Sequence, residues 1–210
     1  MNDNRPSGSD AYPSDCQLTE GLRKMADNRH TSEEIDPRIR ARAEKIDLLL
    51  LDVDGVLTDG TLIFSPEGGE SKGFNTQDGF GISLLGEAGV DVGVITARSS
   101  KAVSERCRGL HMRYICQGER DKLSAYKKIA DQSGLKPFQI AYMGDDWLDL
   151  VLLKRVGLAV APANGMAEVK QHVHYVTRRP GGTGAVREVC ELILRAKGLF
   201  DQLLQSYLSR

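Results

Sequence analysis

Short apolar runs alternate with amphipathic stretches from residue 46 onward. The run Ile46-Asp47-Leu48-Leu49-Leu50-Leu51 has the length and composition of a buried parallel strand. The pattern predicts strands over 46–53, 91–96, 113–116, 139–143, 158–160 and 173–176, and helices over 81–88, 99–110, 121–133, 147–156, 166–171 and 185–197. Strands that alternate with helices predict an α/β fold with a doubly wound, Rossmann-like parallel sheet.

The segments on either side of this alternating region have a different character. Residues 1–45 are polar and rich in breakers at their start, which predicts a largely disordered N-terminal extension with a short helix over 32–44. We expect one domain over 46–197 and a helical C-terminal tail over 198–210. Within the domain, 61–64 and 71–75 flank a turn-forming stretch, which predicts a β-hairpin flap after the first strand.

Composition excludes several classes of function. The net charge is −1 and the chain has no block of basic residues, so nothing indicates a nucleic-acid partner. The longest apolar run is well short of the roughly 20 residues that span a bilayer, so we expect no membrane segment. Neither a C-x-x-C pair nor a signal-peptide core is present, which favours a cytoplasmic protein with reduced thiols. Small-molecule chemistry is the remaining expectation.

Two carboxylates follow the first predicted strand, at the sheet edge where ligands bind in this class of fold. Asp52 is the candidate nucleophile, because a carboxylate can attack phosphorus and divide a hydrolysis into two displacements. Asp54, two residues on, is the candidate acid and base for the leaving oxygen and the attacking water. Thr96 ends a second strand and can bind a phosphoryl oxygen. Lys122 begins a helix and can neutralise charge on the transferring group.

A third acidic segment, Gly144-Asp145-Asp146, predicts a magnesium site. Mg²⁺ prefers oxygen ligands in octahedral geometry. We expect it to bind the carboxylates of Asp52 and Asp145 and the backbone carbonyl of Asp54, with Asp146 and Asp149 orienting Lys122 or the metal waters.

Each of these residues also has a simpler interpretation. A D-x-D after a strand occurs in metal-dependent glycosyltransferases as well. Thr96 alone is typical of a strand end, Lys122 of a solvated helix, and Gly-Asp-Asp of a turn or helix cap. The phosphatase interpretation depends on all four motifs following four successive strands.

The ordered set resembles the haloacid dehalogenase-like phosphatases, and further motifs resemble the 3-deoxy-D-manno-octulosonate 8-phosphate (KDO 8-phosphate) phosphatases among them. These motifs are Lys72-x-Phe74-Asn75-x-x-Asp78-Gly79, Ile95-Thr96-x-Arg98 and Thr177-Arg178-x-x-Gly181-Gly182-x-Gly184. The resemblance implies a Mg²⁺-dependent phosphatase of lipopolysaccharide precursor synthesis that acts on a sugar acid phosphate. It also implies a homotetramer in which a neighbouring subunit completes the active site, because the gaps between motifs are too short for a full cap domain.

Substrate recognition requires cations for the sugar carboxylate. On the family pattern the candidates are Lys72, Arg98 and Arg178, with Asp78 for sugar hydroxyls. Ala97 and Gln77 depart from that pattern, since relatives often have a glycine and a basic residue there.

Two alternatives remain. One is a phosphatase for a sialic-type nine-carbon sugar acid 9-phosphate on the same scaffold. The other is a catalytically silent oligomerisation domain, which the intact Asp54 disfavours.

Overall fold

The computed structural model describes residues 35–66 and 68–209. The prediction of a disordered segment over most of 1–45 therefore lies largely outside the described residues. The short helix predicted at its end is present as α2, over Pro37–Ala43.

A six-stranded parallel sheet forms the centre of the domain and confirms the predicted fold class. Its strands are β1 (Leu48–Leu51), β4 (Asp91–Ile95), β5 (Tyr114–Cys116), β6 (Ile140–Met143), β7 (Leu158–Ala161) and β8 (Tyr175–Val176). Their spatial order is β5-β4-β1-β6-β7-β8. Every residue of β1 is buried. A parallel strand that is covered on both faces is typically apolar at every position, as β1 is.

The chain reverses its direction of travel across the sheet at β1. Leu51 pairs with Val94 of β4 on one side and with Met143 of β6 on the other. The chain therefore forms β4 and β5 on one side of β1 and then crosses to the other side, where it forms β6, β7 and β8. Ligands bind outside the carboxyl ends of strands at such a reversal, and Asp52 is the first residue after β1.

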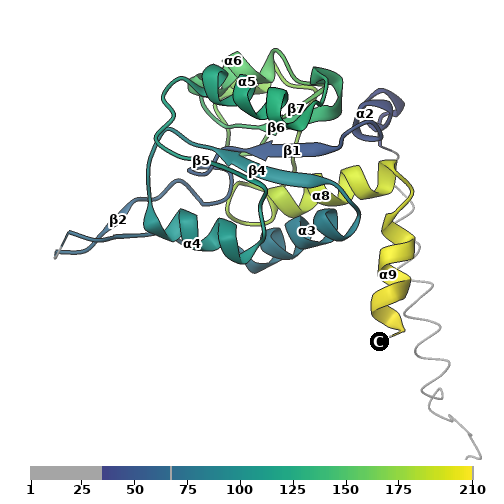
Figure 1. The fold of residues 1–210 in the computed structure, drawn as a ribbon, viewed down its shortest axis with the longest axis horizontal. Helices are drawn as coiled ribbons and strands as arrows, with labels where there is room; N and C mark the ends of the chain where they lie inside the picture. The colour runs from purple at the N-terminus through teal and green to yellow at the C-terminus, as the bar shows by residue number, and fades with distance from the viewer. Residues whose placement is uncertain (1–34, 67, 210) are drawn as a thin grey trace, which may run out of the picture. The chain divides into compact units, whose positions relative to one another are not determined.

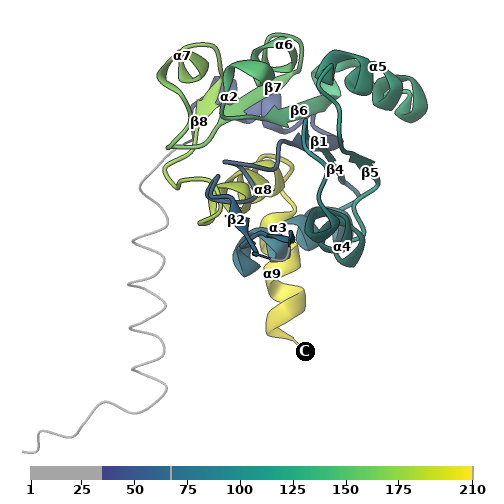
Figure 2. The same ribbon diagram turned by 90° about the vertical axis from the view of Figure 1, so that its left-hand side faces the viewer.

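Two layers of helices cover the sheet (Figure 1, Figure 2). Helices α3 (Thr76–Glu87), α4 (Lys101–Gly109) and α8 (Ala185–Ala196) lie on one face, and α5 (Lys122–Ser133), α6 (Leu150–Leu153) and α7 (Ala167–Lys170) on the other. Short 3₁₀ turns, η1 (Pro137–Gln139) and η2 (Trp147–Asp149), precede β6 and α6, and α9 (Phe200–Leu208) ends the chain. No helix among the described residues is long and apolar enough to cross a membrane.

Two helices differ from the prediction for local reasons. Helix α3 begins at Thr76 rather than at Gly81, because the Asn75 side chain accepts hydrogen bonds from the backbone N–H groups of Gln77 and Asp78 and caps the helix. The single helix predicted over 147–156 is instead the turn η2 followed by the short α6. The apolar pattern located both segments, but it indicated neither the Asn75 cap nor the division of the second segment into a 3₁₀ turn and a short helix.

A two-stranded antiparallel hairpin leaves the domain between β1 and α3, as predicted. Its strands are β2 (Ile63–Phe64) and β3 (Glu70–Ser71), shorter than the expected segments. The hairpin extends away from the sheet in Figure 1. It is the only strand-containing insertion among residues 35–66 and 68–209, and it is far too small to be a cap domain.

Candidate active site

The loop after β1 is held against the end of β6. The Asp52 N–H donates to the Met143 carbonyl over 2.9 Å, which continues the sheet pairing by one residue. The Val53 carbonyl then accepts hydrogen bonds from Leu57 at 2.9 Å and Thr58 at 3.1 Å, so the chain turns at once. Gly55 has a φ of 87°, a left-handed conformation that favours glycine. This turn fixes Asp52 at the carboxyl edge of the sheet.

Gly55 also allows the loop to approach the second acidic segment. A Cβ atom at Gly55 would lie 2.1 Å from Asp145 Oδ2, closer than atoms can pack. The absence of a side chain therefore brings the backbone of the first motif directly against the Asp145 carboxylate.

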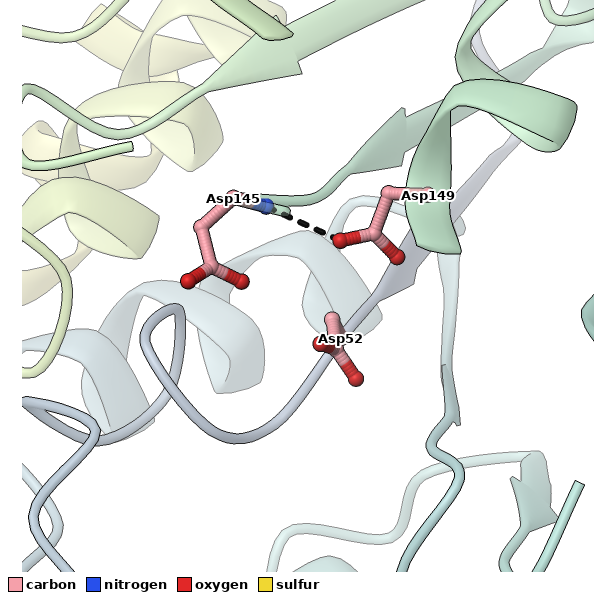
Figure 3. A group of neighbouring side chains, drawn as sticks. All are labelled: Asp52, Asp145 and Asp149. Carbon is pink, nitrogen blue, oxygen red and sulfur yellow. Dashed lines mark hydrogen bonds between the residues drawn. The ribbon is translucent and has the colours of Figure 1, made fainter. Parts of the chain in front are cut away.

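Three carboxylates meet at this point, from Asp52, Asp145 and Asp149 (Figure 3). One oxygen from each lies within 4.8 Å of the others. Asp145 Oδ1 is buried and has no hydrogen-bond partner among the residues that the structure describes. Burial, together with the charges of Asp52, Asp149 and Asp146, raises the pKa of Asp145 to about 7. A buried carboxylate oxygen without a donor, beside other carboxylates, fits a divalent cation with oxygen ligands.

Asp149 has a different role from the other two. Its Oδ1 accepts from Lys122 Nζ and from the Tyr142 hydroxyl, each over 2.6 Å. Its Oδ2 accepts from the backbone N–H groups of Asp145 at 3.0 Å and Asp146 at 3.1 Å. All four strong acceptor positions of the carboxylate are used. Asp149 therefore positions Lys122 and the Asp145 loop, and the candidate metal ligands that remain are Asp52 and Asp145.

Lys122 is the first residue of α5, and its side chain reaches the centre of the cluster. It is only 2% exposed, and its Nζ lies 3.1 Å from Asp52 Oδ1. Burial alone would lower the pKa of Lys122, but the charges of Asp52 and Asp149 outweigh it and raise that pKa. Burial raises the pKa of Asp52, and the Lys122 charge limits the increase, to about 6. Lys122 is thus a fixed cation beside the candidate nucleophile.

Thr96 follows β4 and is buried. Its N–H donates to the Cys116 carbonyl at 3.0 Å, so this amide is not available to a phosphoryl oxygen. Its Oγ1 accepts from the Arg98 N–H at 3.4 Å, a long contact that leaves the hydroxyl hydrogen to act as a donor. These bonds leave the Thr96 hydroxyl available to a phosphoryl oxygen, but not the Thr96 N–H.

Asp54 lies in a group of opposite charges. Lys72 Nζ forms an ion pair with Asp54 Oδ1, and Arg98 Nε lies 3.5 Å from Oδ2. The structure thus brings two of the four predicted substrate contacts, Lys72 and Arg98, to the candidate acid and base. Lys72 directly follows β3 of the hairpin flap, so the flap is tied to the loop that carries Asp54.

The other two predicted substrate contacts lie elsewhere. The Asp78 carboxylate is 1% exposed and accepts hydrogen bonds from the N–H groups of Gly184 at 3.2 Å and Arg187 at 2.7 Å. It therefore caps the start of α8, and its position does not support contact with sugar hydroxyls. Arg178 is exposed, and its N–H donates to Glu188 Oε1 at 3.0 Å. Within one chain, the structure does not bring Arg178 to Asp54.

The glycine-rich turn before α8 packs on the catalytic loop of the same chain. The Gly182 N–H donates to the Val56 carbonyl over 2.9 Å. A Cβ atom at Gly181 would lie 1.8 Å from the Gly55 carbonyl oxygen, so the backbones can approach only because Gly181 lacks a side chain. This turn supports the loop that carries Asp52 and Asp54.

Sequence reasoning missed two residues of the site. Tyr142 lies in the strand predicted over 139–143 and has no role in the sequence analysis, yet its hydroxyl contacts both Asp149 and Lys122, the latter at 3.2 Å. Glu70 was assigned to a turn, yet it pairs with Lys72 at 2.8 Å and with Arg98 at 3.2 Å. The one available signal was that Glu70 and Lys72, two residues apart, share a face if the segment is a strand.

Comparisons with known proteins show the family to which this chain belongs. A family model for haloacid dehalogenase-like hydrolases matches residues 109–188. The 3-deoxy-D-manno-octulosonate 8-phosphate phosphatase of Escherichia coli K12 is 43% identical over 162 residues, 77% of this chain and 86% of that protein. The phosphatase structure from Yersinia pestis is 41% identical with a TM-score of 0.79, and the match covers 80% of this chain and 90% of that one. The Moraxella catarrhalis phosphatase, solved with a magnesium ion, a phosphate ion and KDO, is 39% identical with a TM-score of 0.81. That match covers 82% of this chain and 99% of the other. The chain belongs to the family of KDO 8-phosphate phosphatases within the haloacid dehalogenase-like hydrolases.

Proposed function

We propose that this protein hydrolyses KDO 8-phosphate to KDO and phosphate, with Asp52 as the nucleophile. The observation that carries the proposal is the contact between Asp52 and Lys122, 3.1 Å apart, beside the partnerless oxygen of Asp145. A nucleophilic carboxylate, a fixed cation and an oxygen-rich cation site are the groups that phosphoryl transfer requires.

The residues present fit a magnesium ion. Asp52 and Asp145 would supply carboxylate oxygens, and Asp54 its backbone carbonyl. When bound, Mg²⁺ offsets the charge of the carboxylates and of the phosphoryl oxygens, so that the anionic substrate can approach an anionic nucleophile. A magnesium ion, a phosphate ion and KDO are bound together in the Moraxella catarrhalis relative, which supports this assignment.

The reaction proceeds in two displacements in this proposal. A carboxylate oxygen of Asp52 attacks phosphorus and forms an aspartyl-phosphate, while the bond from phosphorus to the sugar oxygen breaks. Asp54, in its acid form, gives its proton to that sugar oxygen. Water then attacks phosphorus, Asp54 takes a proton from the water, and the bond from phosphorus to Asp52 breaks to release phosphate.

The surrounding residues hold the transferring group during both steps. Lys122 lies beside Asp52 and remains charged, so it binds the phosphoryl oxygens as negative charge grows on them. The Thr96 hydroxyl is the further donor in this proposal. Asp149, bonded to Lys122 over 2.6 Å, keeps that ammonium from leaving the site.

The choice of a sugar acid follows from the charges at the leaving-group side. Lys72 and Arg98 both contact Asp54, which must face the sugar oxygen to protonate it. We therefore assign these cations to the carboxylate of the sugar acid. We assign the reaction to lipopolysaccharide precursor synthesis in the bacterial cytoplasm on the family resemblance.

A homotetramer is the proposed assembly, with the hairpin at its interface. Ile63 and Phe64 on β2 are 54% and 65% exposed, although both are large and apolar. Exposed apolar side chains on a short flap are typical of a surface that a second chain covers. In this assembly a neighbouring subunit shields the active site from water and brings its Arg178 to the substrate.

The experiment that tests the proposal is a comparison of substrates. Phosphate release is measured with Mg²⁺ and with a chelator, using KDO 8-phosphate, a sialic-type sugar acid 9-phosphate and sugar phosphates without a carboxylate. We expect the highest kcat/KM with KDO 8-phosphate and no turnover with the chelator. A higher kcat/KM with the 9-phosphate would make that compound, and not KDO 8-phosphate, the substrate. No turnover of any phosphate would favour the silent oligomerisation domain.

A further inference from the structure

Glu70 lies on β3, and Lys72 directly follows that strand, two residues further on. Alternate residues of a strand share a face, and Ser71 between them is exposed on the other. Glu70 Oε1 lies 2.8 Å from Lys72 Nζ. Glu70 Oε2 accepts a hydrogen bond of 3.2 Å from a terminal nitrogen of Arg98.

Both cations that contact Glu70 also contact Asp54. Two carboxylates and two cations therefore alternate in a closed group drawn from the catalytic loop, the hairpin and the residue shortly after β4. The Lys72 side chain is 1% exposed, so it is enclosed by this group, whereas the Arg98 side chain is 43% exposed. Arg98 has no carboxylate besides Asp54 and Glu70 within 4.0 Å among the described residues that would hold it.

Glu70 itself is unsuited to bind the substrate. Its negative charge would repel both the phosphate and the carboxylate of a sugar acid phosphate. Its effect on the substrate must therefore act through the two cations. If Glu70 were neutral, the positive charges of Lys72 and Arg98 would repel each other, and the exposed guanidinium would be free to adopt other rotamers.

We propose that Glu70 is a positioning residue that sets selectivity for acid sugars. It holds Lys72 and Arg98 beside Asp54, so that the exposed Arg98 guanidinium presents donors to the substrate carboxylate when the sugar arrives, while the enclosed Lys72 contributes its positive charge. A guanidinium has five donors, so Arg98 can contact Glu70 and the substrate at the same time. This inference rests on the proposed function, because it assumes a substrate with a carboxylate.

The test replaces Glu70 with glutamine, which has nearly the same size but no charge. Kinetics are measured with KDO 8-phosphate and with p-nitrophenyl phosphate, which has a phosphate but no carboxylate. We expect kcat/KM for KDO 8-phosphate to fall by about tenfold or more, mainly through a higher KM, and kcat/KM for p-nitrophenyl phosphate to change by less than about twofold. Glu70→Asp, which keeps the charge, should recover part of the loss.

Glu105→Gln is the matched control, because Glu105 is an exposed residue of α4 that pairs with Arg108. Glu105→Gln should leave kcat/KM unchanged for both substrates. Equal losses of Glu70→Gln on both substrates, or no loss on either, would overturn the positioning role. If the unmodified enzyme cleaves p-nitrophenyl phosphate but not KDO 8-phosphate, the proposed function fails and this inference fails with it. If it cleaves KDO 8-phosphate and Glu70→Gln does so equally well, only this inference fails.

Discussion

Lys122 and Asp149 form a buried ion pair, with 2.6 Å between Nζ and Oδ1. The pair joins the start of α5 to the turn η2 after β6, two segments that the sequence separates by 27 positions. Removal of one partner from a buried pair leaves the other charge uncompensated. The pair thus links the stability of the domain to the geometry around Asp52.

Lys122→Met should therefore reduce both activity and stability. It removes the cation beside Asp52 and leaves Asp149 with only neutral donors. We expect loss of measurable turnover and a decrease in the free energy of unfolding of about 3 kcal/mol. Urea unfolding at neutral pH measures the second effect. Lys127→Met, on the exposed side of the same helix, is the control and should change neither quantity. A Lys122→Met variant with wild-type turnover would contradict the role given to this cation.

Asp52→Asn should remove turnover while the fold is retained. The substitution deletes the nucleophilic charge with little change in volume, so kcat should fall by at least about a thousandfold. Circular dichroism and thermal unfolding check the fold. Asp59→Asn, in an exposed part of the same loop, should keep full activity. Normal turnover in Asp52→Asn would place the nucleophile elsewhere.

Tyr142→Phe tests the hydroxyl that supports Asp149 and Lys122. Loss of a hydrogen bond to a charged group costs about 1.5–3 kcal/mol, so we expect a reduction in stability together with a kcat lowered by about three- to tenfold. Tyr126→Phe is the control, because the buried Tyr126 hydroxyl has no hydrogen-bond partner within the described part of the chain. That variant should have wild-type kcat and equal or higher stability. If the two variants behave alike, Tyr142 acts only through packing.

The raised pKa values of Asp52 and Asp145 predict how stability depends on pH. Between the ordinary value of 3.8 and the raised values of about 6 and about 7, the folded chain binds more protons than the unfolded chain. The free energy of unfolding of the metal-free protein should therefore decrease as pH rises through this window. Mg²⁺ competes with the same protons, so its stabilising effect should increase over the same range.

Asp145→Asn separates the contributions to this pH dependence. It removes a charge that three neighbouring carboxylates repel, so metal-free Asp145→Asn should unfold about 2 °C or more above the wild type at pH 8. It should also lose the Mg²⁺-dependent rise in Tm. Thermal scans from pH 4 to pH 8, with and without Mg²⁺, measure both effects. An unchanged response of this variant to Mg²⁺ would exclude Asp145 as a ligand.

Phe64→Glu tests the proposed assembly. A charge at the most exposed large side chain of the hairpin should prevent apolar contact between subunits, so the variant should elute and sediment as a smaller species than the wild type. Sedimentation velocity distinguishes tetramer, dimer and monomer. Lys101→Glu introduces the same charge at an exposed position of α4 and should leave the assembly unchanged. An identical oligomer for Phe64→Glu and the wild type would exclude the hairpin as the interface.

The sequence predicted the sheet and the reactive carboxylates because both depend on local patterns. The run Leu48–Leu51 is apolar at every position, and Asp52 follows it directly, so strand and nucleophile are specified by neighbouring residues. Lys122 begins α5 and Asp145 lies shortly after β6, so local patterns indicate these two positions as well. Because the carboxyl ends of parallel strands lie at the same edge of the sheet, the fold class alone predicts that these positions are close together.

The remaining contacts depend on pairings across the fold. Asp78 accepts hydrogen bonds from residues 106 and 109 positions later in the chain, and no local pattern indicates that its carboxylate caps α8. The role of Tyr142 depends on which side of β6 faces Asp149. The group around Glu70 requires the hairpin to fold back onto Asp54, a matter of tertiary packing. Such contacts can be identified only from the structure.

In the proposed mechanism, Asp52 carries the phosphoryl group during turnover. The direct measurement is a rapid acid quench after mixing the Mg²⁺-loaded enzyme with KDO 8-phosphate, followed by mass analysis of the protein and its peptides. We expect one added phosphoryl group in the peptide that contains Asp52, and none in Asp52→Asn. Phosphate release without a phosphorylated protein, or a phosphoryl group on a different residue, would contradict the account.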